Sequence, residues 1–217
     1  MFKKTLIVIS ILIILLAVIS CAASAQEEGT AEAEQQTVYI NAESLDYQED
    51  KTLLSGGIEI RREDTVIKSE RGELFREEQK MFLEDNIELE YPDGSVSSDI
   101  LTAFLKADEY VFEENVRLNY KLSAENKTMI LKSGYLKIYG ENSSFTAEKE
   151  VVIDYDQQIF KGDNAEYDGS TEKLELSGNV EIEKDDDWIK SDRAVFDLSE
   201  GGEGYTAEGN VQIRMEL

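Results

Sequence analysis

A short phrase of alternating apolar and polar residues recurs along most of the chain. It starts with a branched aliphatic residue and ends two positions later with a second aliphatic residue, as in Val180-Glu181-Ile182. The first position is occupied by Ile58, Ile87, Val116, Val151, Val180 and Val211, and the second by Ile60, Leu89, Leu118, Ile153, Ile182 and Ile213. Successive copies are 29, 29, 35, 29 and 31 residues apart. A period of this length predicts six repeat units stacked into one array.

A second phrase precedes each copy by about 20 residues and supports the same division into units. It is clearest in residues 67–75, 131–139 and 189–197. The residue immediately before the first phrase is Gly57, Asn86, Asn115, Glu150, Asn179 or Asn210, and most of these residue types favour turns. Alternation with a period of two is typical of half-buried strands, and β-branched residues fit strands well. We therefore predict an all-β fold in which each unit supplies two or three short strands.

The first 25 residues have the features of an export leader. Lys3 and Lys4 precede the apolar run 6–19, which is short for a membrane span. Three outcomes are open: cleavage after Ala25, lipidation of Cys21 within a lipobox-like sequence, or retention as a membrane anchor. Residues 26–36 are predicted to form a flexible acidic tether. Residues 37–217 are predicted to form one domain.

Composition narrows the range of functions. The chain carries 22 lysine and arginine residues against 47 acidic residues, for a net charge of −25. Such an excess of negative charge disfavours nucleic-acid binding, because phosphate contacts need cations. The chain has no histidine and one cysteine, and it lacks nucleotide-binding loop motifs, so we predict neither an enzyme nor a cofactor. The acidic run 185–187 is interpreted as a solvated turn, and no metal site is predicted.

Two stretches resemble the OstA-like domain of the LptA family, which bridges the periplasm in lipopolysaccharide (LPS) transport. Residues 160–197 contain "FKGDNAEYDGSTEKLELSGNVEIEKDDDWIKSDRAVFD", and residues 40–75 show a similar order of strand phrases. The resemblance implies an elongated, slightly twisted β-jellyroll whose interior carries the acyl chains of LPS or a similar glycolipid. It also implies partners: inner-membrane exporter components, an outer-membrane LptD-like barrel and other copies joined head to tail. The two central units depart from the pattern, since they lack the Gly-Asn pair.

Inward-facing aliphatic residues are the predicted lipid-binding site. They are Ile58, Ile60, Ile87, Leu89, Val116, Leu118, Val151, Ile153, Val180 and Ile182. Two interpretations of this set remain open. The residues form either an ordinary closed core or the lining of an apolar groove between two separated sheets.

The two ends of the domain are predicted to be uncovered strand edges available for assembly. Val38 and Ile40 mark the first edge, and Val211, Ile213 and Met215 mark the second. An uncovered edge favours pairing with another chain. The leading hypothesis is a periplasmic carrier of an acylated glycolipid. The alternatives are a membrane-anchored, LptC-like partner of the exporter and a structural β-solenoid scaffold without a ligand.

Overall fold

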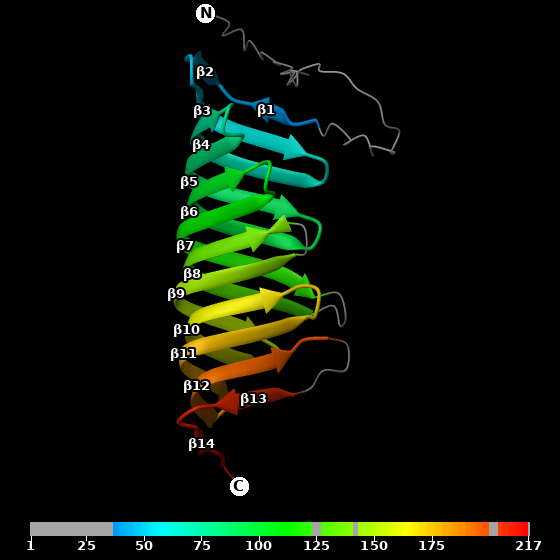
Figure 1. Cartoon of the computed structure of the whole chain (residues 1–217), viewed down its shortest axis with the longest axis vertical. Coiled ribbons are helices and arrows are strands. Elements are labelled where there is room, and N and C mark those ends of the chain that lie inside the picture. Colours follow the sequence, from blue (N-terminus) through cyan, green and yellow to red (C-terminus); the bar gives the residue numbers. More distant parts are fainter. Residues whose placement is uncertain (1–36, 123–126, 141–142, 200–203, 217) are drawn as a thin grey trace, which may run out of the picture.

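The computed structural model describes residues 37–122, 127–140, 143–199 and 204–216. These residues form one 14-stranded antiparallel sheet, and its strands are stacked along the long axis of the molecule (Figure 1). The strands are β1 (Tyr39–Asn41), β2 (Ser44–Tyr47), β3 (Lys51–Arg62), β4 (Thr65–Phe75), β5 (Lys80–Tyr91), β6 (Gly94–Phe104), β7 (Glu109–Leu122), β8 (Lys127–Tyr139), β9 (Ser144–Tyr155), β10 (Gln158–Asp168), β11 (Lys173–Lys184), β12 (Asp187–Asp197), β13 (Tyr205–Glu208) and β14 (Gln212–Arg214).

Each long strand pairs with its neighbours in the sequence. From β3 to β12 the order in the sheet is the order in the chain. At the start of the stack β1 and β2 both pair with β3, and at its end β13 and β14 both pair with β12. The two ends of the stack therefore lie at opposite ends of the long axis (Figure 1).

Every long strand bends in its middle, where the pairing register shifts. In β3, β5, β7, β9 and β11 the bend consists of two consecutive residues with positive φ. These pairs are Gly56-Gly57, Asp85-Asn86, Glu114-Asn115, Lys149-Glu150 and Gly178-Asn179, and Gly209-Asn210 stands in the same relation to β13 and β14. The residue before each aliphatic phrase, interpreted as a turn position, is the second member of the pair. A bulge of this kind redirects a strand without ending its ladder.

The intervening strands bend around a small residue that faces inward. Ser69, Ser98, Ser133 and Ser191 are buried in β4, β6, β8 and β12. Each hydroxyl donates a hydrogen bond to the carbonyl oxygen two residues further on, over 2.8–3.4 Å. In β10 the corresponding residue is Gly162. The local bond satisfies a polar group that would otherwise be costly to bury.

The bends fold the sheet over on itself into two layers that enclose a single apolar core. We call the layer that contains Ile58 and Ile60 the first layer, and the layer that contains Leu54 and Leu83 the second. Figure 1 shows them as a bright front set and a fainter back set of strand segments. This architecture confirms the predicted elongated, all-β jellyroll.

The strands are longer than predicted in most units. The four inner units each contain two strands of 11–14 residues, whereas the first and last units each contain one long strand and two strands of three or four residues. The two alternating runs on either side of a bend are halves of one strand, because the positive-φ pair preserves the ladder while changing the direction of the chain.

Candidate functional site

The ten aliphatic residues predicted to line the groove all lie in the first layer and face the interior. Their side chains are between 0 and 5% exposed. The ladder places them in two rows that run along the stack, for example Ile87 opposite Ser98 and Leu89 opposite Val96. The structure thus brings these residues together on one continuous inner surface.

The opposing inner surface, in the second layer, was missed by the sequence reasoning. It consists of equally buried side chains, among them Leu54, Met81, Leu83, Leu101, Ala103, Phe112, Leu136, Ala147, Leu174 and Leu176. A signal was present, because Leu174 and Leu176 also alternate with polar residues, namely Lys173, Glu175 and Ser177. Such runs lie before the bends in the chain. The alternation alone does not show that they form a separate layer opposite the first one.

The two layers meet along a seam opposite the bends, where the strand ends and connecting turns form two rims. The first rim belongs to the first layer and includes Arg62, Thr65, Tyr91 and Tyr120. The second rim belongs to the second layer. It includes the β6–β7 turn at residues 105–108, the end of β8 and the start of β9.

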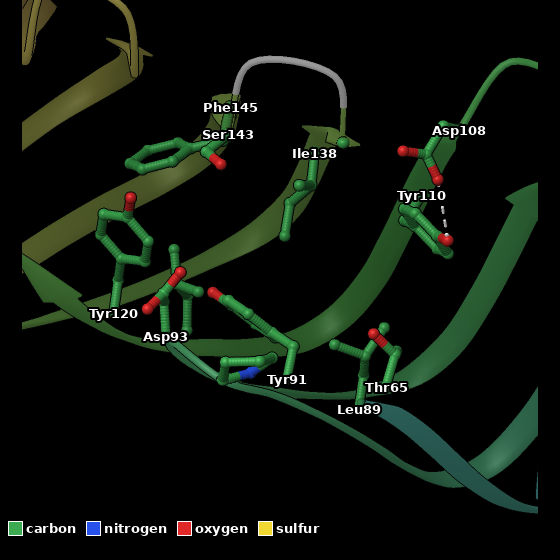
Figure 2. Close-up of a pocket in the computed structure, with 13 residues that line it drawn as sticks. Thr65, Leu89, Tyr91, Asp93, Asp108, Tyr110, Tyr120, Ile138, Ser143 and Phe145 are labelled. Carbon is green, nitrogen blue, oxygen red and sulfur yellow. Dashed lines mark hydrogen bonds between the residues drawn. The ribbon is translucent and has the colours of Figure 1, made fainter. Parts of the chain in front are cut away.

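A cavity of about 260 Å³ lies between the rims in the middle of the stack. The first rim contributes Thr65, Leu89, Tyr91, Pro92, Asp93, Leu118 and Tyr120, and the second contributes Asp108, Tyr110, Ile138, Gly140, Ser143 and Phe145. Figure 2 shows the two groups of side chains facing each other. Of the ten predicted groove residues, Leu89 and Leu118 line this cavity. The aromatic residues at its mouth were not predicted from the sequence, because a tyrosine at the end of a strand is equally consistent with an ordinary surface residue.

The tyrosines at the cavity mouth contribute apolar rings to its lining, and each ring ends in a polar hydroxyl. Burial raises the pKa of the Tyr91, Tyr110 and Tyr120 hydroxyls above the ordinary tyrosine value. These hydroxyls are therefore neutral near pH 7 and can donate hydrogen bonds. The Tyr110 hydroxyl already donates to Asp108 Oδ1 over 3.1 Å (Figure 2). Such side chains suit the boundary between a hydrocarbon chain and a polar head group.

Contacts that cross the seam close the layers at several points. Arg62 on the first rim lies 3.4 Å from Asp108 on the second (Nη1 to Oδ1). The rings of Tyr120 and Tyr167 meet edge to face, with centroids 5.8 Å apart. Further along the stack Phe160 and Phe196 pack at 4.5 Å.

The two ends of the stack carry most of the exposed large apolar side chains of the described residues. Of the residues predicted to form the assembly edges, Val211, Ile213 and Met215 are 46–64% exposed, while Val38 and Ile40 are half-buried. Tyr39, Leu45, Tyr47 and Tyr205 are also exposed at the ends and were not predicted.

Charged groups lie mainly on the outer surface. Within the described segments no three acidic, histidine or cysteine side chains are grouped so that they could hold a metal ion. In the acidic run 185–187, the Asp187 carboxylate accepts a hydrogen bond of 2.9 Å from the backbone of Glu216, which fastens the last part of the chain to β12. Several exposed acids are held by cations, and hydrogen bonds from Arg193 lower the pKa of Glu175.

The predicted leader and tether, including Cys21 and Ala25, lie outside the described residues. In the part of the chain that the structure describes, no helix has the length and apolar character needed to cross a membrane.

Comparison with known proteins identifies one family. The profile described as "LptA/(LptD N-terminal domain) LPS transport protein" matches residues 38–201 and, in a second overlapping match, 158–216. Together the two matches cover nearly all of the described residues. A comparison with curated proteins gave no match.

Proposed function

Because the chain belongs to the LptA/LptD N-terminal domain family of LPS transport proteins, we propose that it carries LPS, or a related acylated glycolipid, through its interior. The observation that carries the proposal is the apolar inner surface between two layers that are joined at the bends. Among the described residues, the contacts found across the seam are between side chains. Transfer would take place in the periplasm, toward the outer membrane.

Energetics favour the burial of acyl chains over the repulsion expected from the acidic surface. Each buried methylene contributes about 0.8 kcal/mol, so a chain of about twelve carbons gains on the order of 10 kcal/mol. Repulsion between one lipid phosphate and one exposed carboxylate is about 1 kcal/mol in water and is reduced further by salt. Part of this gain in free energy offsets the cost of separating the two layers, which are packed against each other in the free protein.

The two ends of the stack are suited to head-to-tail joining. The β1–β2 pair runs from the first layer to the second, whereas the β13–β14 pair runs from the second to the first. Stacked against each other, they would continue the antiparallel alternation of the sheet. The bends at the two ends of the stack make the same backbone hydrogen bond. The Glu43 amide donates to the Gly56 carbonyl at one end, and the Asp192 amide donates to the Gly209 carbonyl at the other, each over 3.0 Å. We propose that copies of this chain, or partners of the same fold, join in this way.

Binding is tested with immobilised protein and purified LPS, in calcium-containing buffer so that cation bridging is available. The proposal predicts that LPS is retained and that a detergent with a single acyl chain competes for it. A well-folded protein that retains no acylated glycolipid would refute the carrier function.

One observation favours a second candidate, the structural scaffold. All ten aliphatic residues that were predicted to line the groove are at least 95% buried, as expected for a permanently closed core. A scaffold would bind no acylated ligand in the same assay but would still assemble through its ends.

A further inference from the structure

The central cavity is bounded at each end by a contact between the two rims. At one end the Arg62 guanidinium meets the Asp108 carboxylate, which also accepts the Tyr110 hydroxyl. At the other end the Tyr120 ring meets Tyr167, which is stacked on Phe145 with centroids 5.3 Å apart. The cavity lies between these contacts, and Tyr110, Tyr120 and Phe145 belong to its lining.

Both contacts are independent of the backbone ladder. Arg62 ends β3, whereas Asp108 lies in the β6–β7 turn, and these segments do not pair in the sheet. Tyr120 in β7 and Tyr167 in β10 are likewise on strands that do not pair. The contacts can therefore break while every ladder hydrogen bond stays intact. A seam held by side chains can open at far lower cost than a sheet can be unpaired.

The charge around the cavity restricts the head group that fits there. Among the described residues that line the cavity, Asp93 and Asp108 are carboxylates and none is a cation. A lipid carboxylate or phosphate placed beside Asp93 would face like charge, whereas Asp108 is already paired with Arg62. Neutral hydroxyl or amide groups can instead pair with the tyrosine hydroxyls and with the carboxylates.

We propose that this cavity is a lateral entry site for a single acyl chain attached to a neutral, hydroxyl-bearing part of a lipid. The Arg62–Asp108 and Tyr120–Tyr167 contacts act as two gates that set the rate at which the chain enters and moves along the interior. The inference rests on the proposed function, since it assumes that the interior accepts acyl chains.

The test measures how fast a fluorescent monoacylglycerol binds to and leaves the full chain, expressed with its own leader. Arg62→Gln removes the charge but keeps much of the side-chain stem, so association and dissociation should both accelerate by about threefold or more. The exchange variant Arg62→Asp with Asp108→Arg restores opposite charges and should return both rates toward the wild-type values. Unchanged rates in Arg62→Gln would overturn the assignment of this gate.

A locked variant tests the gate from the opposite direction. The chain has one cysteine, Cys21, so Cys21→Ser with Arg62→Cys and Asp108→Cys allows a short bis-maleimide to bridge the rims. Bridging should slow both rates at least tenfold, whereas the same variant capped with a monofunctional maleimide should exchange as fast as Arg62→Gln. Equal rates in the bridged and capped proteins would contradict the proposal. Circular dichroism confirms that each variant is folded.

The choice of lipid separates failure of this inference from failure of the proposed function. The monoacylglycerol should bind more tightly than the fatty acid of equal chain length, because the fatty acid places a carboxylate near the carboxylate of Asp93. Equal or reversed affinities would overturn the head-group preference alone. If neither probe binds and LPS is also not retained, the carrier function itself fails.

Discussion

The bend at Gly178 gives the sharpest prediction about how the fold is specified. Gly178 has φ +75°, and a Cβ atom there would lie 2.5 Å from a carboxylate oxygen of Asp163. The same carboxylate accepts a 2.8 Å hydrogen bond from the side-chain amide (Nδ2) of Asn179. Gly178→Ala therefore combines the left-handed backbone penalty of about 1–2 kcal/mol with displacement of a hydrogen bond worth about 1 kcal/mol. We expect a total loss of about 2–3 kcal/mol of unfolding free energy.

Gly57, the second residue of the positive-φ pair in β3, provides a control that lacks the steric clash. Its φ is +58°, but an added Cβ would meet no atom within 4 Å. Gly57→Ala should thus cost only the backbone term, about 1–2 kcal/mol. Both variants are compared by urea unfolding followed by circular dichroism, with the midpoint and slope fitted separately, since stacked repeats can lose cooperativity.

A third variant tests the steric contribution of the Asp163 carboxylate at Gly178, while the Asp163 Cβ, 2.9 Å from the added atom, stays in place. Asp163→Ala removes the carboxylate that an alanine at position 178 would meet, so the double variant should be more stable than the sum of the two single effects implies. The coupling should be about 1 kcal/mol in the relieving direction. Strict additivity, or equal losses in Gly178→Ala and Gly57→Ala, would refute the idea that the Asp163 carboxylate packs over the bend.

Three further predictions concern the core, the ends and the surface charge. Leu136→Ala, in the unpredicted second layer, should lower the unfolding free energy by about 3 kcal/mol, because the side chain is 0% exposed; a loss below about 1 kcal/mol would contradict its placement. Ile213→Asp should abolish concentration-dependent assembly in multi-angle light scattering while leaving the melting temperature almost unchanged, whereas persistent oligomers would exclude the β14 edge. Raising NaCl from about 0.01 to 0.15 M should increase the melting temperature, because salt shortens the range of repulsion in a chain of net charge −25; a decrease would show that attractive ion pairs dominate.

The periodicity of the sequence predicted the architecture well because each repeat of the aliphatic phrase coincides with a bend in the sheet. A phrase such as that at Val180–Ile182 follows a positive-φ pair and always begins the first-layer half of a strand. Even the units that lack Gly-Asn conform, since Glu114-Asn115 and Lys149-Glu150 adopt positive φ as well. Neighbouring ladders on both sides hold these bends in the same place.

The cavity and the side-chain contacts across the seam could not be predicted in the same way. Arg62 and Asp108 are 46 residues apart, and their contact depends on how far the layers fold toward each other along a twisted stack. Local alternation shows which face of a strand is apolar, but not which strand ends will meet across the seam. The second layer was not predicted for a related reason. The bend divides each long strand into two runs with the same alternation of apolar and polar residues, so the sequence does not show that the runs belong to different layers.

The most direct test of the central claim is site-specific photo-crosslinking to LPS. A benzophenone amino acid replaces Tyr120, which lines the cavity, and in a matched control it replaces Tyr135, whose ladder partners Glu113 and Glu148 place it on the outer face of the second layer. Irradiation should give LPS adducts at position 120 and few or none at position 135. Equal labelling at the two positions, or no adduct at position 120 in a folded protein, would contradict the claim that acyl chains enter the interior between the rims.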